Sequence, residues 1–581
     1  AILAPGLRDC RFCEYQRFFC SSMILKLRSM AVFAAGVAFG AFAEETSAGK
    51  AFVLLGATGD NAYRPAGVWT GLFEVWCNGI LRETHLHVQI NQGHTEDEVR
   101  TKVLDTLTPF YDGMKEDRSW KCMLEDCSPR TFFASGRLNI WKGEGKYNAS
   151  GQAANMSFLA EYNEVIAYMS VPPSAYKDWA DAMVQYWGGG TKVQVAFEKP
   201  FGSGRDSLKD AKDLHSSIIA SGLAAENFHL TDHWLSFFMN EHLATFRQIV
   251  QPRLGVDWST RGIERIVVTE YEERGFGGRG SFIDGLGQTR DMVQSHLLQV
   301  LALTMMDPEA TSISAAKLAV FKDLSLVGCE LKQFDGLLES KYLKYHADFA
   351  DSTFCRAKFS SLAKDWEGVD LVIQTAKAMD INLYTIEVYQ RGGPGVLTFD
   401  IGKEEVGLGD IKVSNWMLKD ASPFDAPIPG FDSTTTMRVT PVVDSTGSGY
   451  ILRYDDPDMY FPKPYAKIVS ALLSGDYGAA FVTWPECQRS WEILTGSSPM
   501  ECLDPTPEKV EVYLPAFLCD KTAPEVCDQH VTVKDLYDVK FACTPQHDVW
   551  YSGIDLYKAK CMQAAAPEAP SNVRFTTSFV V

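Results

Sequence analysis

The sequence has little that would place the protein in a membrane or on a nucleic acid. After the first 45 residues, no apolar run approaches the roughly 20 residues that cross a bilayer. Basic residues are in deficit, since 55 Lys and Arg stand against 74 Asp and Glu, for a net charge of -19. Binding to a phosphate backbone requires a clustered basic surface. We therefore expect no nucleic-acid partner and no membrane association, and small-molecule chemistry is favoured.

Close cysteine pairs are missing from the C-terminal region, and with them the usual sign of a zinc module. The last four cysteines are widely and irregularly spaced, so no metal site is expected. In a tail rich in loops they fit two disulfides of an oxidising compartment, with the pairing left open. These residues are Cys519, Cys527, Cys543 and Cys561. Repeats and low-complexity segments are absent too, and 581 residues with 46% apolar content should form two or more globular domains.

The first 45 residues have the pattern of a targeting segment. After Met23 come two basic residues, an apolar run at 31–40 and the small residues Ala41 and Ala43. This order is typical of a secretory signal peptide with its cleavage site. We expect a protein of the secretory pathway, in the endoplasmic reticulum lumen, secreted, or in an organelle reached by that route. Asn-x-Ser patterns for glycosylation begin at Asn148 and Asn155.

The next part of the chain alternates between strand and helix patterns. Strand-like runs lie at 51–60, 85–91, 164–171 and 193–202. A helix opens at Thr95, where Glu98 completes a capping box. This alternation predicts a parallel, doubly wound sheet, whose strands bind ligands at their carboxyl ends. Lys199 and Asp232 are expected at such ends.

A glycine turn ends the first strand. Gly56 and Gly59 permit close backbone approach, and the helix that follows can hold a pyrophosphate at its N-terminus. Gly-x-x-Gly in a turn is more often structural when it stands alone. The order of strand, turn and helix is what makes this segment a candidate coenzyme site.

Beyond Phe237 the pattern changes. A helix through about residue 250 leads to a strand at 263–273, a glycine-rich hairpin at 275–280 and a long helix predicted from Asp284 to about Met306. Later strand-like segments are joined by turns, as in an antiparallel sheet. The second half is therefore predicted to be an α+β domain.

Seven short motifs follow one another along the chain. They are GATGD at 56–60, VPP at 171–173, EKPFG at 198–202, DHWL at 232–235, GRGSFID at 278–284, QTRDMVQSHLLQ at 288–299 and WEGVDLVIQTAKAM at 366–379. In this order they resemble the glucose-6-phosphate dehydrogenase family. The resemblance implies a Rossmann-like, doubly wound coenzyme domain followed by an α+β domain with a large, mostly antiparallel sheet, and a homodimer or homotetramer. We place an upstream segment at 1–45, the dinucleotide-binding domain at 46–232, the substrate and oligomerisation domain at 233–505 and a tail at 506–581.

The resemblance also implies a role for each matching residue. His296 would be the general base that takes the proton of the sugar 1-hydroxyl, and Asp232 would hold its imidazole. An ordinary pKa near 6.5 suits histidine to this task. Positions that match substrate contacts are Lys199, Glu272, Asp291 and Lys377 for the sugar hydroxyls, and His233 and Trp234 for the phosphate. Positions that match coenzyme contacts are Gly56, Thr58, Gly59, Asp60, Arg64, Lys199 and Pro200.

Each residue also has an ordinary structural explanation. Asp232 fits a helix N-cap, and His296 among leucines fits a core position. Glu272 and Lys377 fit solvated charges at strand ends. On an α-helix, Asp291 and His296 would be about 140° apart and would reach one ligand only near the helix start.

Several positions depart from the family pattern. Leu230 stands in place of an arginine, and Trp234 and Phe237 stand in place of a tyrosine and a lysine that grip phosphate. An apolar side chain cannot replace a charge-assisted bond to phosphate. At the coenzyme end the segment after GATGD lacks the usual lysines, and Gln92 occupies the place of an arginine for a 2′-phosphate. NADP is expected on family grounds, with NAD as the alternative.

Three functions are compatible with the sequence. The first is oxidation of C1 of glucose 6-phosphate to 6-phosphoglucono-lactone with NADP, the entry step of the oxidative pentose phosphate pathway. The second is dehydrogenation of an unphosphorylated or different hexose. The third is a structural or interaction homologue that has lost catalysis, which Gln92 and Pro65 would favour.

Overall fold

The computed structural model describes residues 49–513 with gaps. Within this range the residues outside the description are 60–61, 65, 91–92, 117–123, 125, 143–147, 203–206, 256, 273–274, 276–285, 335–351, 378, 380–381, 402–410, 416–421, 428–435, 444–446, 448, 455–461, 479, 497–501 and 504–510. The predicted targeting segment, most of the glycine-rich hairpin, nearly all of the tail and its four cysteines also lie outside it. Among the described helices, none has the length and hydropathy needed to span a membrane.

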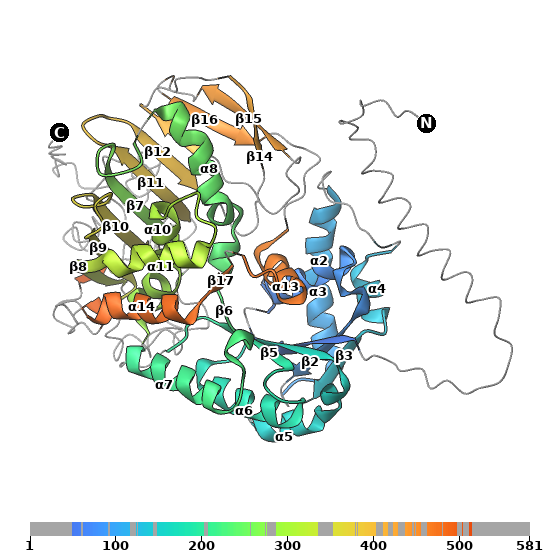
Figure 1. Ribbon diagram of the computed structural model, residues 1–581. Coiled ribbons are helices and arrows are strands. Elements are labelled where there is room, and N and C mark those ends of the chain that lie inside the picture. The colour runs from blue at the N-terminus through green and yellow to red at the C-terminus, as the bar shows by residue number, and fades with distance from the viewer. Residues whose placement is uncertain are drawn as a thin grey trace, which may run out of the picture. The chain divides into compact units, whose positions relative to one another are not determined.

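The first sheet is formed by the alternating part of the chain (Figure 1). Its described strands are seven, in the order β17-β6-β5-β4-β1-β2-β3, and all pairs from β1 to β6 are parallel, as predicted. The edge strand β17 comes from the far end of the chain and pairs antiparallel with β6. The strands are β1 (Lys50–Leu55), β2 (Thr84–Ile90), β3 (Leu138–Lys142), β4 (Glu164–Met169), β5 (Val193–Glu198), β6 (Phe228–Thr231) and β17 (Phe481–Val482).

Side chains that alternate along β1 fill the two faces of this sheet. Phe52 and Leu54 join a core cluster with α2, α3 and α13, whereas Val53 and Leu55 join a second cluster with α6 and α7. The capping box predicted at Thr95 and Glu98 is present at the start of α3. The helices are α2 (Val68–Cys77), α3 (Glu96–Glu116), α4 (Pro129–Ala134), α5 (Ala149–Asn155), α6 (Tyr176–Tyr186), α7 (Ser207–Ala220) and α13 (Pro464–Ser474). Short 3-10 helices are η1 (Ile80–Glu83), η2 (Ser157–Glu161), η3 (Pro173–Ala175), η4 (Ala225–Asn227) and η5 (His233–Ser236).

The second sheet is larger and mostly antiparallel, as predicted. Its described strands are eleven, in the order β14-β15-β16-β13-β12-β11-β7-β10-β9-β8-β18, with parallel pairing only between β7 and β10 and between β8 and β18. The strands are β7 (Ile263–Tyr271), β8 (Leu324–Phe334), β9 (Phe354–Ser361), β10 (Asp370–Ala376), β11 (Leu383–Gln390), β12 (Val396–Asp400), β13 (Ile411–Ser414), β14 (Phe424–Pro427), β15 (Thr436–Val443), β16 (Gly449–Tyr454) and β18 (Glu511–Tyr513).

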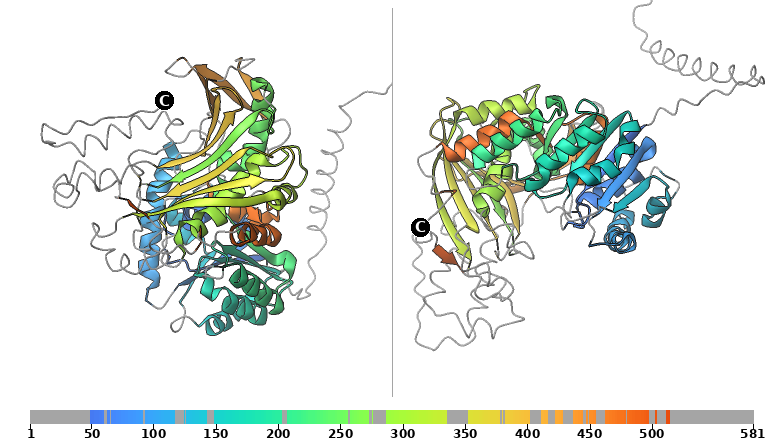
Figure 2. Two further views of the ribbon diagram at one scale, coloured as in Figure 1. Left: turned by 90° about the vertical axis from the view of Figure 1, so that its left-hand side faces the viewer. Right: turned by 90° about the horizontal axis from the view of Figure 1, so that it is seen from below.

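Helices cover one face of the second sheet (Figure 2). Apolar side chains of these helices, such as Leu243, Leu301 and Phe321, form one core cluster with Ile266 and Ile373 of the strands. The helices are α8 (Phe238–Leu254), α10 (Leu298–Met305), α11 (Ile313–Asp323) and α14 (Trp484–Thr495). This layer brings the start of α8 and the helix before α10 toward the end of β6.

The helix predicted from Asp284 is not a uniform α-helix. Residues Thr289–Leu297 form a π-helix, η6, which continues as the α-helix α10 from Leu298. A π-helix bonds residue i to i+5, so side chains five apart lie on one face. The predicted separation of Asp291 from His296 by about 140° is therefore wrong, because it assumed 3.6 residues per turn.

A disulfide joins the second sheet to a distant segment. Cys329 of β8 is bonded to Cys502, which lies 173 residues further along the chain. Cys127 is also disulfide-bonded, whereas Cys355 and Cys487 are buried thiols. The sequence did not indicate the pairing of Cys329, because its partner is brought near only by the fold.

Candidate active site

Two side chains leave the first sheet next to each other at its carboxyl edge. β5 and β6 pair in parallel with Glu198 opposite Thr231, so Lys199 and Asp232 follow at adjacent positions. Both line a hollow with a volume of about 30 Å³. Ligands of doubly wound sheets bind at this edge. The two residues thus lie where the sequence placed them.

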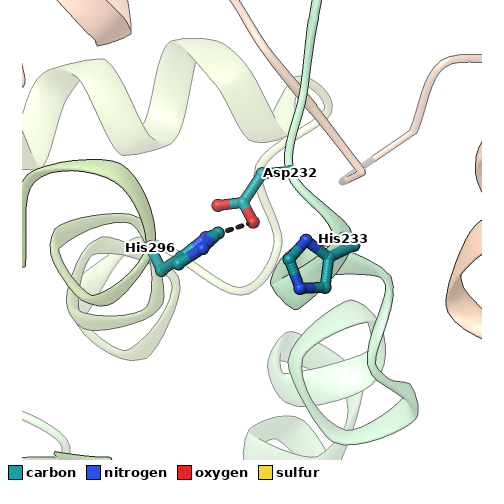
Figure 3. A group of neighbouring side chains, drawn as sticks. All are labelled: Asp232, His233 and His296. Atoms are coloured by element: carbon teal, nitrogen blue, oxygen red, sulfur yellow. Dashed lines mark hydrogen bonds and ion pairs between the residues drawn. The ribbon is translucent and has the colours of Figure 1, made fainter. Parts of the chain in front are cut away.

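Asp232 holds a histidine from the second half of the chain. Its Oδ1 accepts the backbone N–H of Trp234 at 2.9 Å and so caps η5. The same oxygen lies 2.5 Å from Nδ1 of His296. Figure 3 shows the imidazole of His296 directed at this carboxylate, with His233 on the other side. Asp232 is therefore both a helix cap and the partner of His296.

The Asp232–His296 pair is withdrawn from solvent, with exposed fractions of 2% and 0%. Burial lowers the pKa of His296 to about 4, although the Asp232 carboxylate opposes this shift. Burial raises the pKa of Asp232, but the charge of His296 and its hydrogen bond outweigh burial and leave that pKa below its ordinary value. At neutral pH an ionised Asp232 thus accepts a proton held on Nδ1 of a neutral His296. Nε2 then carries a lone pair, and it has no hydrogen-bond partner among the described residues.

The π-helix brings a second carboxylate to the same face as His296. Asp291 lies one π-turn before His296, and its Oδ1 accepts a hydrogen bond of 2.7 Å from Nζ of Lys199. Nζ of Lys199 is also near enough to lower the pKa of His296. The structure therefore brings Lys199, Asp291 and His296 together, which an α-helix would not have done.

A second ion pair lies at the ends of two parallel strands. β7 and β10 pair with Tyr271 opposite Ala376, and the next residues, Glu272 and Lys377, form an ion pair of 2.5 Å between Oε2 and Nζ. The Lys377 side chain is only 2% exposed, so the alternative of a solvated lysine is wrong, while Glu272 is 25% exposed. Both residues have the hydrogen-bonding groups expected for contacts to sugar hydroxyls.

Aromatic rings surround the imidazole of His296. His233 lies edge-on to it with ring centroids 5.2 Å apart and stacks on Tyr465 of α13 at 5.5 Å. Trp234 stacks on the imidazole of His296, with ring centroids 5.6 Å apart. One donor atom each from Asp232, His233 and His296 lie within 4.8 Å of one another, a set able to hold a metal ion. Because Asp232 and His296 are already joined by a hydrogen bond, we interpret the group as an acid–base site.

The positions that depart from the family pattern are buried in the core. Leu230, Trp234 and Phe237 are 5%, 6% and 5% exposed, and the rings of Trp234 and Phe237 lie 5.2 Å apart. All three belong to one hydrophobic cluster. His233 and Lys377 are described groups of the site that can carry positive charge.

The coenzyme loop packs tightly against the end of β4. Gly56 has φ +79°, and a Cβ there would lie 2.0 Å from the carbonyl oxygen of Ser170, so no other residue fits. Thr58 is half-buried and Gly59 exposed, and the half-buried Arg64 follows on a short turn. Pro200, buried after a cis peptide bond, follows Lys199 at the end of β5. Asp60, Pro65 and Gln92 lie outside the described residues.

Three residues at the site were not singled out from the sequence. Glu270 lies on β7 two positions before Glu272, which directly follows the strand end, so the alternation of side chains places both on one face and was an available signal. Lys102 of α3 sits 4.0 Å above the ring of Tyr63, beside Arg64. Tyr465 reaches His233 from a helix far along the chain, and no local pattern indicates that contact.

Comparison with known families matches most of the chain. Residues 53–238 match the model of the glucose-6-phosphate dehydrogenase NAD binding domain, and residues 252–499 match that of the glucose-6-phosphate dehydrogenase C-terminal domain. Glucose-6-phosphate 1-dehydrogenase of Saccharomyces cerevisiae is 26% identical over 421 residues, covering 69% of this chain and 77% of that protein. The cytoplasmic glucose-6-phosphate 1-dehydrogenase 5 of Arabidopsis thaliana is 25% identical over 464 residues, covering 76% and 84%.

Solved structures share the fold. A glucose-6-phosphate dehydrogenase in complex with its substrate glucose-6-phosphate superimposes with a TM-score of 0.60 at 22% identity, covering 83% of this chain and 98% of that one. The Mycobacterium avium glucose-6-phosphate 1-dehydrogenase superimposes with a TM-score of 0.58 at 19% identity, covering 81% and 94%. At these identities the likeness establishes the arrangement of the two sheets, and residue roles rest on the geometry above.

Proposed function

The chain belongs to the glucose-6-phosphate dehydrogenase family of oxidoreductases, and from this premise we propose that it oxidises C1 of glucose 6-phosphate to 6-phosphoglucono-lactone with NADP as hydride acceptor. The observation that carries the proposal is the buried Asp232–His296 pair, with Nδ1 of the imidazole held and Nε2 directed elsewhere. It also argues against a homologue that has lost catalysis.

His296 supplies the base in this reaction. Its neutral imidazole accepts the proton of the 1-hydroxyl on Nε2, which turns that oxygen into the incipient lactone carbonyl. The ion pair with Asp232 then stabilises the imidazolium, because a carboxylate at 2.5 Å is the nearest countercharge. NADP, held at the Gly56 loop, would supply the acceptor for the hydride that leaves C1. The surrounding rings of His233 and Trp234 exclude water from the imidazole.

Two ion pairs orient the sugar. Lys199–Asp291 and Glu272–Lys377 are partly or wholly buried, and each offers a donor and an acceptor to a hydroxyl that enters between them. The close packing of Gly56 against Ser170 fits a dinucleotide loop at the edge of the same sheet. Lys102 places a positive charge over the ring of Tyr63, the residue before Arg64, which supports NADP over NAD.

Turnover of glucose 6-phosphate with NADP is expected for the purified chain, and the sugar phosphate should be compared with free glucose. Absorbance at the nicotinamide band, measured with NADP and then NAD, gives kcat/KM for each pair. Loss of one hydrogen bond between a cationic side chain and the phosphate costs about 1.5–3 kcal/mol of binding free energy. The ratio of kcat/KM for glucose 6-phosphate to kcat/KM for glucose should therefore be about 10–150-fold smaller than in a site that keeps this cation. No turnover of either sugar with either coenzyme would contradict the proposed function.

A second candidate is a dehydrogenase of an unphosphorylated or different hexose. Buried Leu230, Trp234 and Phe237 favour it, because they place apolar surface where phosphate-binding groups were expected. Glucose would then equal or exceed glucose 6-phosphate in kcat/KM in the same assay. Preference for the phosphate by orders of magnitude would eliminate this candidate.

We also propose that the protein works in the secretory pathway. The Cys329–Cys502 disulfide supports an oxidising compartment. The asparagine of each glycosylation pattern is exposed, with Asn148 capping α5 and Asn155 ending it. Expressed with its own leader in a secretory eukaryotic host, the chain should lose mass on glycosidase treatment, and Asn155→Gln should remove part of that shift. An unshifted, unglycosylated chain retained in the cytosol would refute the proposal.

A homodimer or homotetramer is proposed on the family resemblance, and a monomer in sedimentation would refute it.

A further inference from the structure

A third carboxyl group lies beneath the two ion pairs of the sugar site. Glu270 is fully buried on β7, and strand alternation directs it to the same face as Glu272. On the parallel strand β10, Thr375 stands opposite Glu270, two residues before Lys377. Glu270 therefore sits one layer inside the Glu272–Lys377 pair. Glu270 has no role in the proton transfer or the sugar contacts described above.

Hydrogen bonds tie Glu270 to the element that carries the base. Its Oε2 accepts the hydroxyl of Thr375, and the amide of Gln288 donates to that hydroxyl oxygen at 2.6 Å. The same amide lies 3.5 Å from Oε2 of Glu270. Gln288 is the residue before the π-helix with Asp291 and His296, so this group connects β7 and β10 to the start of η6.

Two acceptor atoms in this group have no partner among the described residues. They are Oε1 of Glu270 and Oε1 of Gln288, both buried. An unpartnered acceptor in a dry interior is costly, and an unpaired carboxylate more so. A proton on Oε1 removes the charge of Glu270, and a neutral carboxyl group costs much less to bury than an unpaired carboxylate. The burial of Glu270 and its unpartnered oxygen therefore favour a carboxylic acid at this position.

The charges around Glu270 favour the same state. The charged groups that act on it are Glu272 after β7, Asp291 on η6 and Lys377 after β10. On the neighbouring strands, Tyr384 of β11 stands opposite Glu270 and Cys355 of β9 stands opposite Thr375. The two nearby ammonium groups are already paired with carboxylates, Lys199 with Asp291 and Lys377 with Glu272, so neither is left to balance a charge on Glu270. Burial first, and then repulsion by Glu272, raises the pKa of Glu270 to about 8.

We propose that Glu270 is a positioning residue of the sugar site that works as a neutral carboxylic acid, and that the hold on the sugar weakens when this proton is lost. The idea rests on the proposed function. A neutral Glu270 leaves Lys377 and Lys199 balanced by Glu272 and Asp291 and anchors the start of η6. An ionised Glu270 adds a third negative charge, which competes for Lys377 and repels Glu272 from its hydroxyl contact.

The test compares the pH profiles of the wild type, Glu270→Gln and Glu387→Gln. Glutamine keeps a donor and an acceptor but cannot ionise. Glu387 is a matched control, because it is equally buried with a pKa raised to about 8 by burial, yet it faces the other side of the second sheet. We expect kcat/KM of the wild type and of Glu387→Gln to fall about tenfold per unit above pH 8, through KM, and that of Glu270→Gln to stay level. An unchanged alkaline limb in Glu270→Gln, or loss of its activity at pH 7, would overturn the proposal.

Thermal unfolding separates this proposal from the proposed function. Between the unfolded pKa of about 4.3 and the folded pKa near 8, only the folded protein binds the proton of Glu270, so stability falls as pH rises through this window. The Tm of Glu270→Gln minus the Tm of the wild type should therefore increase as the pH is raised from 5 to 8. Parallel Tm curves would refute the neutral acid whether or not the protein turns over sugar. A chain without turnover refutes the proposed function and the positioning role together, while the unfolding curves still decide the state of Glu270.

Discussion

Replacing His296 with asparagine is expected to lower kcat about 10⁴-fold, at the upper end of what a general base contributes. Asparagine has similar size and can donate to Asp232, but its amide cannot accept a proton. His296 is fully buried, so bulk water cannot easily act in its place. The loss should appear in kcat with little change in KM, because the imidazole is needed in the transition state more than for sugar binding.

The control for this variant is another buried histidine changed in the same way. His242 of α8 is 5% exposed, and burial also lowers its pKa to about 4. His242→Asn should lose some stability but retain kcat within about threefold, since the contacts of His242 within the described part of the chain are with Phe238, Glu241 and Phe246. Steady-state rates and Tm are measured for both variants. If His296→Asn kept more than a tenth of the wild-type kcat, or if His242→Asn lost as much, the assignment of the base would be wrong.

Local patterns in the sequence predicted the architecture well where neighbours in sequence determine the structure. Thr95 and Glu98 cap α3 because both partners lie within one turn. The alternation of strands and helices similarly predicts the parallel order of β1 to β6. Contacts between distant segments were not predictable in this way. β17 joins β6 by pairing Phe481 with Thr231, and Cys329 reaches Cys502, because tertiary packing selects these partners.

The candidate site shows the same division. Motifs indicated Asp232, His296, Lys199 and Asp291, but their convergence depends on the switch to a π-helix between Thr289 and Leu297. No propensity scale distinguishes nine residues of π-helix from α-helix, since the difference lies in the i→i+5 bonding imposed by the surrounding core. Glu270 was overlooked for another reason. In a strand rich in charges, sequence alone does not tell a buried acid from a solvated one.

Asp232→Asn is expected to lower kcat about 10²–10³-fold, less than loss of the base itself, because the imidazole remains. The Asp232 carboxylate now accepts the Nδ1 proton and leaves the lone pair on Nε2. An asparagine can instead donate its amide to Nδ1, which favours the tautomer with the proton on Nε2 and leaves only a fraction of the imidazole able to act as the base. Loss of the carboxylate also removes the charge that raises the pKa of His296, so the histidine that remains is a weaker base.

The variant must be separated from simple loss of a helix cap, since Asp232 also accepts the N–H of Trp234. Ser312→Ala provides the match, because it removes a capping side chain from α11 at a distance from the imidazole and should cost about 1 kcal/mol of stability with kcat unchanged. The double variant Asp232→Asn/His296→Asn adds a stricter test. If Asp232 acts through His296, the double variant is no slower than His296→Asn alone, because residues that act as a unit are not additive. If the two losses of kcat multiplied in the double variant, Asp232 would serve the reaction by a route other than His296. If Ser312→Ala lost as much kcat as Asp232→Asn, the effect of Asp232 would be that of a helix cap alone.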